Sequence, residues 1–383
     1  MQAIITIIAA IFVFALVIFI HEFGHFLFAK LFGVRVNEFA IGMGPTLVKK
    51  QGKETLYSIR AVPIGGYCAM EGENESSDDP NAFGNKKVWQ RVIIVCGGAV
   101  FNVILGFILY LIIIGVNPTI TTPGIEAFTP NSALQAAGAQ KGDQIVKIND
   151  TDVNIYEDIS FFMTRAKGNP ILVTLDRGNK EVTLTVTPTK VTETYQYMKD
   201  KVIYTMKQNG KVISTQTITD QKTLKGVTDK IGQTESASRY MLGFDPADVK
   251  TTFSSLICSA FYNTLFICKL VYTSLFELVT GQIPISQVSG PVGIIGSIST
   301  AAKYGFITLL RFLAMIKINL GVFNLLPIPA LDGGRLVFLI YEGIARKPVP
   351  PKKEGLVHMI GFIVLIGFII FVSFSDILKL LPH

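Results

Sequence analysis

Two histidines and a glutamate stand at the end of a strongly apolar run near the start of the chain. The run from Ile4 to Ile20 is followed by HEFGH, so His21 and His25 are four residues apart. On a helix such residues share a face, which lets both imidazoles bind one zinc ion while Glu22 serves as a general base. Histidines that merely cap a helix end or meet lipid headgroups are the plain alternative. Ionisable groups are costly in a membrane, and this favours a functional role.

A zinc site with two histidines needs a third protein ligand and one open position. Asp332 is the preferred candidate, because it lies in the stretch NLLPIPALDGGRL of a later apolar segment. Pro327 and Pro329 cannot continue a regular helix, and we expect Gly333 and Gly334 to loosen it again. Broken backbone at membrane depth is where intramembrane enzymes and transporters build their sites. The alternative ligands are His358, which begins the last apolar segment, and His383, the final residue.

The composition indicates a membrane protein. Of the 383 residues, 49% are hydrophobic and 16% are charged, whereas a soluble domain usually carries about a quarter charged residues. The net charge of +7 does not indicate nucleic-acid binding, because the basic residues lie beside apolar segments and form no long tract. Four scattered cysteines predict free thiols. The first apolar run lacks a basic leader and a cleavage site, so we interpret it as a retained transmembrane helix.

Four segments are long and apolar enough to span a bilayer, which takes roughly 20 residues. They are residues 3–30, 91–116, 305–341 and 356–380. The apolar segment 249–278 is interrupted by polar residues, which favours an amphipathic helix on the membrane surface, with a fifth span as the alternative. The loops after the first and third spans are basic, so we expect both in the cytoplasm. The two termini and residues 117–304 then lie outside.

Two regions between the spans predict β structure. Outside, a strand is followed by a short helix from Ser132, a turn at Gly142 and strands at 144–148, 171–175 and 181–187. Asn209-Gly210 between two alternating runs predicts an appended hairpin, next to a flexible piece. Inside, strands near 46–49 and 55–62 predict a hairpin that ends at Gly65-Gly66. Its free edge is a template for another chain.

These motifs together resemble the bacterial site-2 proteases, and most closely the regulator-of-sigma-E branch, over essentially the whole chain. HEFGH ends the first span, NxxPxPxLDGG lies in the third, and a PDZ-like module stands between them. The resemblance implies that His21, His25 and Asp332 bind zinc and that Glu22 is the catalytic base. The substrate-binding residues that it implies are Asn324, Pro329, Gly65, Gly66 and Asn102.

The sequence departs from the family pattern in two places. The second span often contains G-P-x-x-N in this family, but here it contains Gly98-Ala99-Val100-Phe101-Asn102, which puts the local helix shape in doubt. The outer region holds one PDZ-like unit, whereas some relatives have two. In a permuted PDZ fold, residues 240–244 either line a peptide groove or form a closing core strand, and the sequence does not decide between these alternatives.

The predicted fold is a polytopic α-helical membrane protein with four transmembrane helices, a membrane-associated β-hairpin and an extracytoplasmic α+β PDZ-like domain. Its expected parts are a first transmembrane helix with HExxH (1–32), a cytoplasmic loop with the β-hairpin (33–90), a second helix (91–117), the PDZ-like domain with its appended hairpin (118–248), amphipathic surface helices (249–304), a third transmembrane segment (305–345), and a basic loop with the fourth helix (346–383).

The expected activity is zinc-dependent hydrolysis of a peptide bond inside the bacterial inner membrane, near the cytoplasmic face. The resemblance implies a single-span substrate of the anti-sigma-factor type, or remnant signal peptides, with a peptide or partner docked at the PDZ-like domain. The lipid bilayer is a further expected partner, and nucleic acid is not expected. A transporter and a non-catalytic scaffold are the rival functions, and a scaffold has no need of Glu22.

Overall fold

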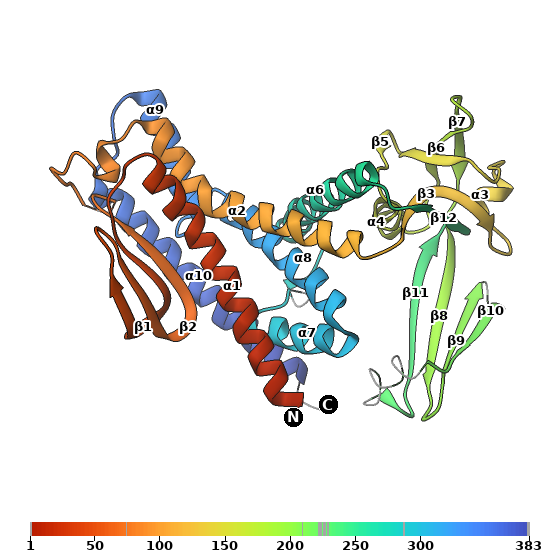
Figure 1. Ribbon diagram of the computed structural model, residues 1–383. Coiled ribbons are helices and arrows are strands. Elements are labelled where there is room, and N and C mark those ends of the chain that lie inside the picture. The colour runs from red at the N-terminus through yellow and green to blue at the C-terminus, as the bar shows by residue number, and fades with distance from the viewer. Residues whose placement is uncertain are drawn as a thin grey trace. The chain divides into compact units, whose positions relative to one another are not determined.

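The computed structural model describes residues 2–73, 75–208, 210–220, 224, 227, 230–285 and 288–380. Contacts within the chain divide it into two compact units (Figure 1). The first unit combines residues 1–113 with residues 267–383, and the second comprises residues 114–266. The domain boundaries given above stay predictions.

The first unit is mainly helical, and it contains every candidate site residue. Its helices are α1 (Gln2–Leu31), α2 (Val88–Gly115), α7 (Pro291–Tyr304), α8 (Phe306–Asn324), α9 (Asp332–Ala345) and α10 (Pro351–Leu380), with a short 3-10 helix at Phe83–Asn85. The helix α6 (Phe253–Val279) runs across the boundary between the two units.

Four helices in the described part of the chain are long and apolar enough to cross a membrane. They are α2, α6, α8 and α10, the last over Lys352–Lys379. The predicted span at the start of the chain forms one 30-residue helix, α1. Because α6 meets the same criterion as the other three, the choice between a surface helix and a further span stays open. The third predicted span is two helices, α8 and α9, separated by residues 325–331.

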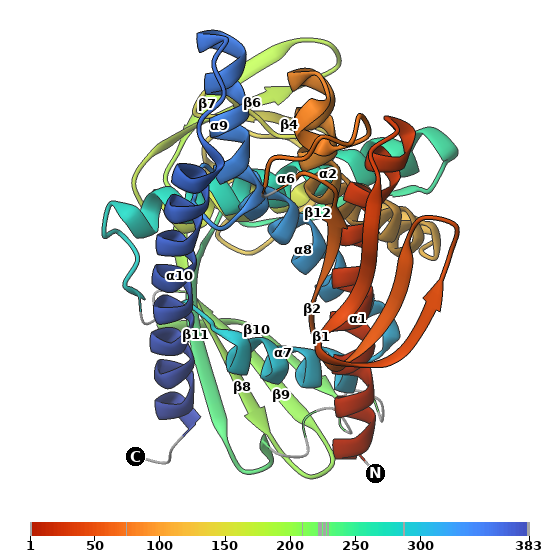
Figure 2. The ribbon, with the colours of Figure 1, turned by 90° about the vertical axis from the view of Figure 1, so that its left-hand side faces the viewer.

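The strands β1 (Val36–Gln51) and β2 (Leu56–Met70) form an antiparallel sheet beside α1 (Figures 1 and 2). Both strands are bent, so that residues 36–41 pair with 66–70 on one side and residues 38–41 pair with 56–59 on the other. The predicted hairpin, with strands near 46–49 and 55–62, is therefore shorter than the observed one, whose strands cover residues 36–51 and 56–70. The chain turns where Gly42 and Gly65 adopt φ angles of 85° and 79°, which residues with a side chain rarely do.

The second unit is built on two antiparallel sheets. One has the order β12-β3-β4-β6-β7, with β5 paired to β4, and the other has the order β10-β9-β8-β11. The strands of the first sheet are β3 (Thr119–Phe128), β4 (Gln144–Ile148), β5 (Thr151–Asp152), β6 (Ile171–Asp176), β7 (Glu181–Val186) and β12 (Phe244–Lys250). Those of the second are β8 (Thr189–Tyr197), β9 (Val202–Gln208), β10 (Lys211–Ile218) and β11 (Thr234–Met241).

Most elements expected in the second unit are confirmed. The strands at 144–148, 171–175 and 181–187 are β4, β6 and β7, and the Ser132 hydroxyl accepts the Gln135 backbone N–H at 3.1 Å to cap α3 (Ala133–Ala136). The helix α4 (Tyr156–Ala166) was not predicted. The hairpin turn at Gly210 joins β9 to β10, but β8 and β11 extend that hairpin into a four-stranded sheet. Asn209 lies outside the described residues.

Candidate metal centre

The helix α1 carries the two histidines on one face, as their spacing predicts. The Nε2 atoms of His21 and His25 are 3.4 Å apart, and their rings lie edge to face. Asp332, the first residue of α9, brings its Oδ2 atom to 3.5 Å from His21 Nε2 and 3.4 Å from His25 Nε2. The three residues predicted as ligands therefore come together from two helices, and within the described chain they form the one such group of metal-binding side chains.

The spacing of these three atoms fits a zinc ion. Zinc binds nitrogen and oxygen at about 2.0–2.2 Å, and the corners of a tetrahedron of that size are about 3.3–3.6 Å apart. The triangle formed by His21, His25 and Asp332, with sides of 3.4, 3.5 and 3.4 Å, falls in this range. Oδ2 of Asp332 is buried, and it has no hydrogen-bond partner among the described residues. A cation would satisfy this atom.

The backbone of α2 sets the orientation of His25. Its Nδ1 atom lies 2.9 Å from the carbonyl oxygen of Ile94, to which Nδ1–H donates. The ring proton then sits on Nδ1, and the lone pair of Nε2 faces the other two candidate ligands. His25 is buried, so it keeps this orientation without competition from bulk water.

Glycines let α1 and α2 approach closely at this level. A Cβ atom on Gly97 would lie 2.7 Å from the carbonyl oxygen of Gly24, between the two histidines. A Cβ atom on Gly98 would lie 2.6 Å from Cε1 and Nδ1 of His21, and closer still to Nε2 of His25. The imidazoles therefore lie directly against the backbone of Gly98. This role was not predicted from the sequence, although adjacent glycines in an apolar helix indicate close helix packing.

The loop between α8 and α9 places Asp332. The helix α8 ends at Asn324, as the prolines predict, and Ala330 takes a φ angle of +80° with its N–H donated to Nδ1 of His358 at 3.1 Å. A Cβ atom on Gly361 of α10 would lie 2.7 Å from the carbonyl oxygen of Pro329, so α10 packs tightly on the loop. His358 thus supports the loop and is not part of the ligand group. The alternative ligand His383 lies outside the described residues.

The expectation that Gly333 and Gly334 loosen the helix is wrong. Both are buried in the first turn of α9. A Cβ atom on Gly334 would lie 2.5 Å from the carbonyl oxygen of Ile328, and one on Gly333 would lie 2.5 Å from the carbonyl carbon of Leu325. Their lack of a side chain lets the loop fold tightly onto the start of α9, and this fixes Asp332.

Glu22 lies between the histidines and the sheet. A Cβ atom on Gly66 would lie 3.3 Å from Cγ of Glu22, and the backbone N–H of Cys68 interacts with the Glu22 carboxylate. Of the glycine pair that was predicted to bind substrate, Gly66 is thus near the site. Gly65 lies against Met43, since a Cβ atom there would be 2.9 Å from Cε of that side chain.

Two asparagines border the His21 ring. Nδ2 of Asn324 lies 3.3 Å from Nε2 of His21, and Nδ2 of Asn102 lies 3.2 Å from its Nδ1. Asn324 therefore reaches the atoms that would hold the metal, whereas Asn102 contacts the far side of the ring. Pro329 shapes the loop before Asp332. The structure brings these residues to the site, and their contact with substrate stays a prediction.

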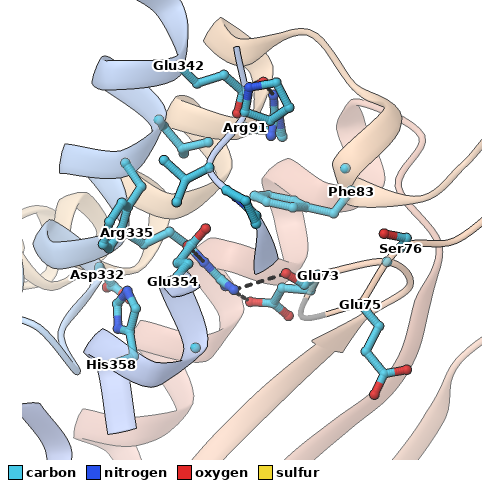
Figure 3. Close-up of a pocket in the computed structure, with 18 of the residues that line it drawn as sticks. Glu73, Glu75, Ser76, Phe83, Arg91, Asp332, Arg335, Glu342, Glu354 and His358 are labelled. Atoms are coloured by element: carbon cyan, nitrogen blue, oxygen red, sulfur yellow. Dashed lines mark hydrogen bonds and ion pairs between the residues drawn. The ribbon is translucent and has the colours of Figure 1, made fainter. Parts of the chain in front are cut away.

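A polar cavity of about 940 Å³ opens beside Asp332 (Figure 3). Arg335 binds Glu73 and Glu354 there, the latter at 3.3 Å, and Arg91 binds Glu342. The cavity walls come from the segment after β2, from α9 and from the start of α10, and Figure 3 shows the ion pairs within them. Of the three candidate ligands, Asp332 lines this polar cavity.

The triangle of two imidazoles and a carboxylate, with a glutamate beside it and apolar helices around it, defines a candidate membrane metallopeptidase. Comparison with known proteins leads to the family. The model of peptidase family M50 matches residues 9–368, and the chain belongs to this family.

Relatives match the chain over nearly its full length, and they carry the name "Putative zinc metalloprotease". One from Clostridium acetobutylicum is 40% identical, covering 97% of both chains. One from Clostridium perfringens is 33% identical over 97% of this chain and 98% of the relative. One from Staphylococcus aureus strain COL is 28% identical over 99% of both. The predicted resemblance to site-2 proteases, the class of zinc metalloprotease and the zinc cofactor are confirmed at the level of the family.

Proposed function

We propose that this protein hydrolyses a peptide bond in the transmembrane segment of a single-span membrane protein. The observation that carries the proposal is the donor triangle of His21, His25 and Asp332 with Glu22 at its side, located among helices apolar enough to span a membrane. The substrate is a protein of the anti-sigma-factor type, cut during regulated intramembrane proteolysis, or a remnant signal peptide.

Glu22 acts as the general base in this proposal. Zinc held by the two histidines and Asp332 would lower the pKa of a bound water to about 7 and polarise a substrate carbonyl. Glu22, next to His21 on α1, takes the proton from the attacking water and passes it to the leaving amine. Asn324 has its amide beside Nε2 of His21, where it can donate a hydrogen bond to the substrate carbonyl oxygen.

The substrate is held as an added strand of the β1–β2 sheet. A transmembrane helix hides its carbonyl groups, so the segment must unwind before hydrolysis, and an open strand edge binds extended chains. The segment 66–70 of β2 pairs with β1 on one side, and the described strands offer it no second partner. Gly66 and Cys68 bring this segment to Glu22. An extended peptide bound there lies next to the candidate metal centre.

The orientation in the membrane follows from charge. The loops that carry Lys49, Lys50, Lys86 and Lys87, and Arg346 with Lys347, are basic and are placed in the cytoplasm. The candidate metal centre then lies near the cytoplasmic face of a bacterial inner membrane. The termini and residues 117–304 are then outside it.

The second unit is proposed to be a PDZ-like domain that docks a peptide or a partner. A cavity of about 90 Å³ lies between α4 and residues 239–244, with Ser160 and Thr164 on one wall and Tyr240 on the other. Leu242 and Phe244 of the same segment are buried in the core. The single strand predicted over 240–244 is wrong, because β11 ends at Met241 and β12 begins at Phe244. The segment nevertheless buries Leu242 and Phe244 in the core and borders the cavity.

The test is cleavage of a single-span substrate by full-length protein in detergent, wild type beside Glu22→Gln, with zinc measured in both. The wild type should cut, and Glu22→Gln should retain zinc and not cut. A zinc-loaded, folded wild type that cuts none of a panel of single-span substrates would instead support a scaffold.

A further inference from the structure

A carboxylate lies in the middle of the β1–β2 sheet, among apolar neighbours. Glu38 belongs to the segment 36–41, which pairs with residues 66–70 on one side and, over residues 38–41, with residues 56–59 on the other. Only 18% of the Glu38 side chain is exposed. A charged group that is largely removed from water needs hydrogen-bond partners to offset its cost. The partners of Glu38 therefore show which parts of the sheet it connects.

Glu38 accepts hydrogen bonds from both neighbouring segments. On one side the Ser58 hydroxyl donates to its Oε1 atom at 2.6 Å, and the Arg60 guanidinium donates to the same atom at 2.8 Å. On the other side the Tyr67 hydroxyl donates to its Oε2 atom at 2.8 Å. The two oxygens of one carboxylate thus connect three neighbouring segments of the sheet.

A small residue in the middle segment makes these contacts possible. Ala40 is fully buried, and it pairs with Ser58 on one side and with Tyr67 on the other. Side chains two residues apart in a strand lie on the same face, so Glu38 and Ala40 share a face. The methyl group of Ala40 leaves room above the sheet, and the Glu38 carboxylate reaches the two flanking hydroxyl groups through this room.

Tyr67 is held at its ring as well as at its hydroxyl group. The Arg60 guanidinium lies over the ring, 5.1 Å from its centroid, which is a favourable cation–π distance. In the chain, Tyr67 stands between Gly66 and Cys68. These two neighbours are the residues of β2 that approach Glu22. The anchored tyrosine therefore lies at the part of the strand that faces the proposed general base.

The segment 66–70 is also the strand edge at which the substrate is proposed to bind. It pairs with β1 on one side, and the described strands offer it no second partner. An edge strand that is paired on one side only can shift along its partner unless side chains fix its register. The register of this segment decides which substrate peptide bond comes to lie beside Glu22.

We propose that Glu38 and Tyr67 are positioning residues, which fix the segment 66–70 and thereby the register in which a substrate strand is presented to the candidate metal centre. This inference rests on the proposed function, because it assumes that the substrate pairs with this edge. Within the described chain, neither residue forms a hydrogen bond with a candidate ligand. Zinc binding should therefore not depend on them.

The test is cleavage of a single-span substrate by full-length protein in detergent, with KM, kcat, zinc content and, by mass spectrometry, the position of the cut. Tyr67→Phe removes only the hydroxyl group. It is expected to raise the KM about 10-fold, because hydrogen bonds to a charged group are among the stronger ones. It should also allow a second cut two residues away, since a shift by two residues keeps every side chain on its face. The kcat for total cleavage and the zinc content should stay unchanged, as expected for a loss of substrate binding alone.

Tyr57→Phe is the matched control. Tyr57 lies in the same sheet and packs its ring on Phe26 and Phe39, and its hydroxyl group has no hydrogen bond among the described residues. This variant should leave the KM and the cut unchanged. Glu38→Ala should behave like Tyr67→Phe, and Glu38→Gln, which keeps an acceptor oxygen, should fall between Glu38→Ala and the wild type. The double variant of Glu38→Ala and Tyr67→Phe should raise the KM no further than Glu38→Ala alone.

An unchanged KM with a single cut in Tyr67→Phe overturns the proposal. A loss of kcat or of zinc without a change in KM also overturns it, because the pair would then act on the metal centre and not on the substrate strand. Equal effects in Tyr57→Phe, or additive losses in the double variant, show that Tyr67 does not act through Glu38. If Glu38→Ala does not give folded protein, Tyr67→Phe and Glu38→Gln decide in the same assay. A wild type that cuts no single-span substrate contradicts the proposed function itself, and that result is distinct from all of these.

Discussion

Gly98→Ala should empty the metal centre without unfolding the protein. The new methyl group would lie 2.6 Å from Cε1 and Nδ1 of His21 and closer still to His25, whereas ordinary contacts begin at 3.4 Å. The His21 ring must therefore move by about 0.8 Å, while ligand positions in a metal site tolerate about 0.2 Å. We expect zinc affinity to fall at least 10- to 100-fold and peptide cleavage to fall at least about 100-fold.

The fold should withstand this substitution. Inserting a methyl group into packed structure costs about 1–3 kcal/mol, and replacing glycine by alanine within a helix returns about 1 kcal/mol. Two variants of the same helix serve as controls. The new methyl group of Gly106→Ala would overlap the side chain of Ile318, so this variant disturbs packing away from the imidazoles. The new methyl group of Gly115→Ala would lie at an ordinary 3.8 Å from Leu256, so this variant should be neutral.

The assay compares zinc content, zinc Kd and thermal stability of the three variants with those of the wild type. We expect a loss of zinc in Gly98→Ala alone, with a melting temperature close to that of Gly106→Ala. If Gly98→Ala binds zinc as tightly as the wild type, the imidazoles are not held against α2, and the geometry described for the site is wrong.

Three further predictions concern the metal and two buried carboxylates. Removing zinc with a chelator should abolish cleavage while helix content measured by circular dichroism is kept, and added zinc should restore activity; activity that survives full removal would contradict this. Arg177 binds both oxygens of Asp143 at 2.8 and 2.7 Å and thereby holds the pKa of that carboxyl below its usual range. This ion pair therefore stabilises the folded protein fully above the unfolded pKa of Asp143, about 3.9, and the stabilisation is lost as the pH falls through the lower folded pKa. Asp143→Asn should lower the free energy of unfolding by about 2 kcal/mol at pH 7, and that free energy should depend less on acid pH than in the wild type. Hydrogen exchange in the second unit measures both effects. Asp376 on α10 accepts the N–H groups of Gly290 and Gly293 at 2.8 Å each, and Asp376→Asn should speed hydrogen exchange in the first turn of α7; equal exchange in both proteins would refute the capping role.

The ligands of the candidate site were predictable from the sequence because each carries a local signal. His21 and His25 have the spacing of one helix face, and Asp332 follows two prolines that must end a helix inside an apolar segment. Each of these patterns involves only residues that are close together in the chain. The ligands could therefore be recognised without knowing which distant segments pack against one another.

The surroundings of the site were less predictable, because they depend on contacts between distant segments. Residues 36–41 form a strand only by pairing with 66–70 and 56–59, and their own sequence, with Glu38 in the middle, gives a weak strand signal. Gly98 is important because the imidazole rings of α1 pack against it, and the sequence of α2 alone does not indicate this contact. Lys317, which is fully buried in α8, was not singled out from the sequence, because its partners, Val17 and Asn102, lie on two other helices.

X-ray absorption spectroscopy at the zinc edge tests the central claim most directly, on full-length protein purified in detergent. We expect one zinc ion per chain with nitrogen and oxygen ligands only, at about 2.0–2.2 Å, including two imidazoles. Asp332→Ala should lose most of the bound zinc. A sulfur shell near 2.3 Å, or full zinc loading in Asp332→Ala, would contradict the assignment of His21, His25 and Asp332 as the metal centre.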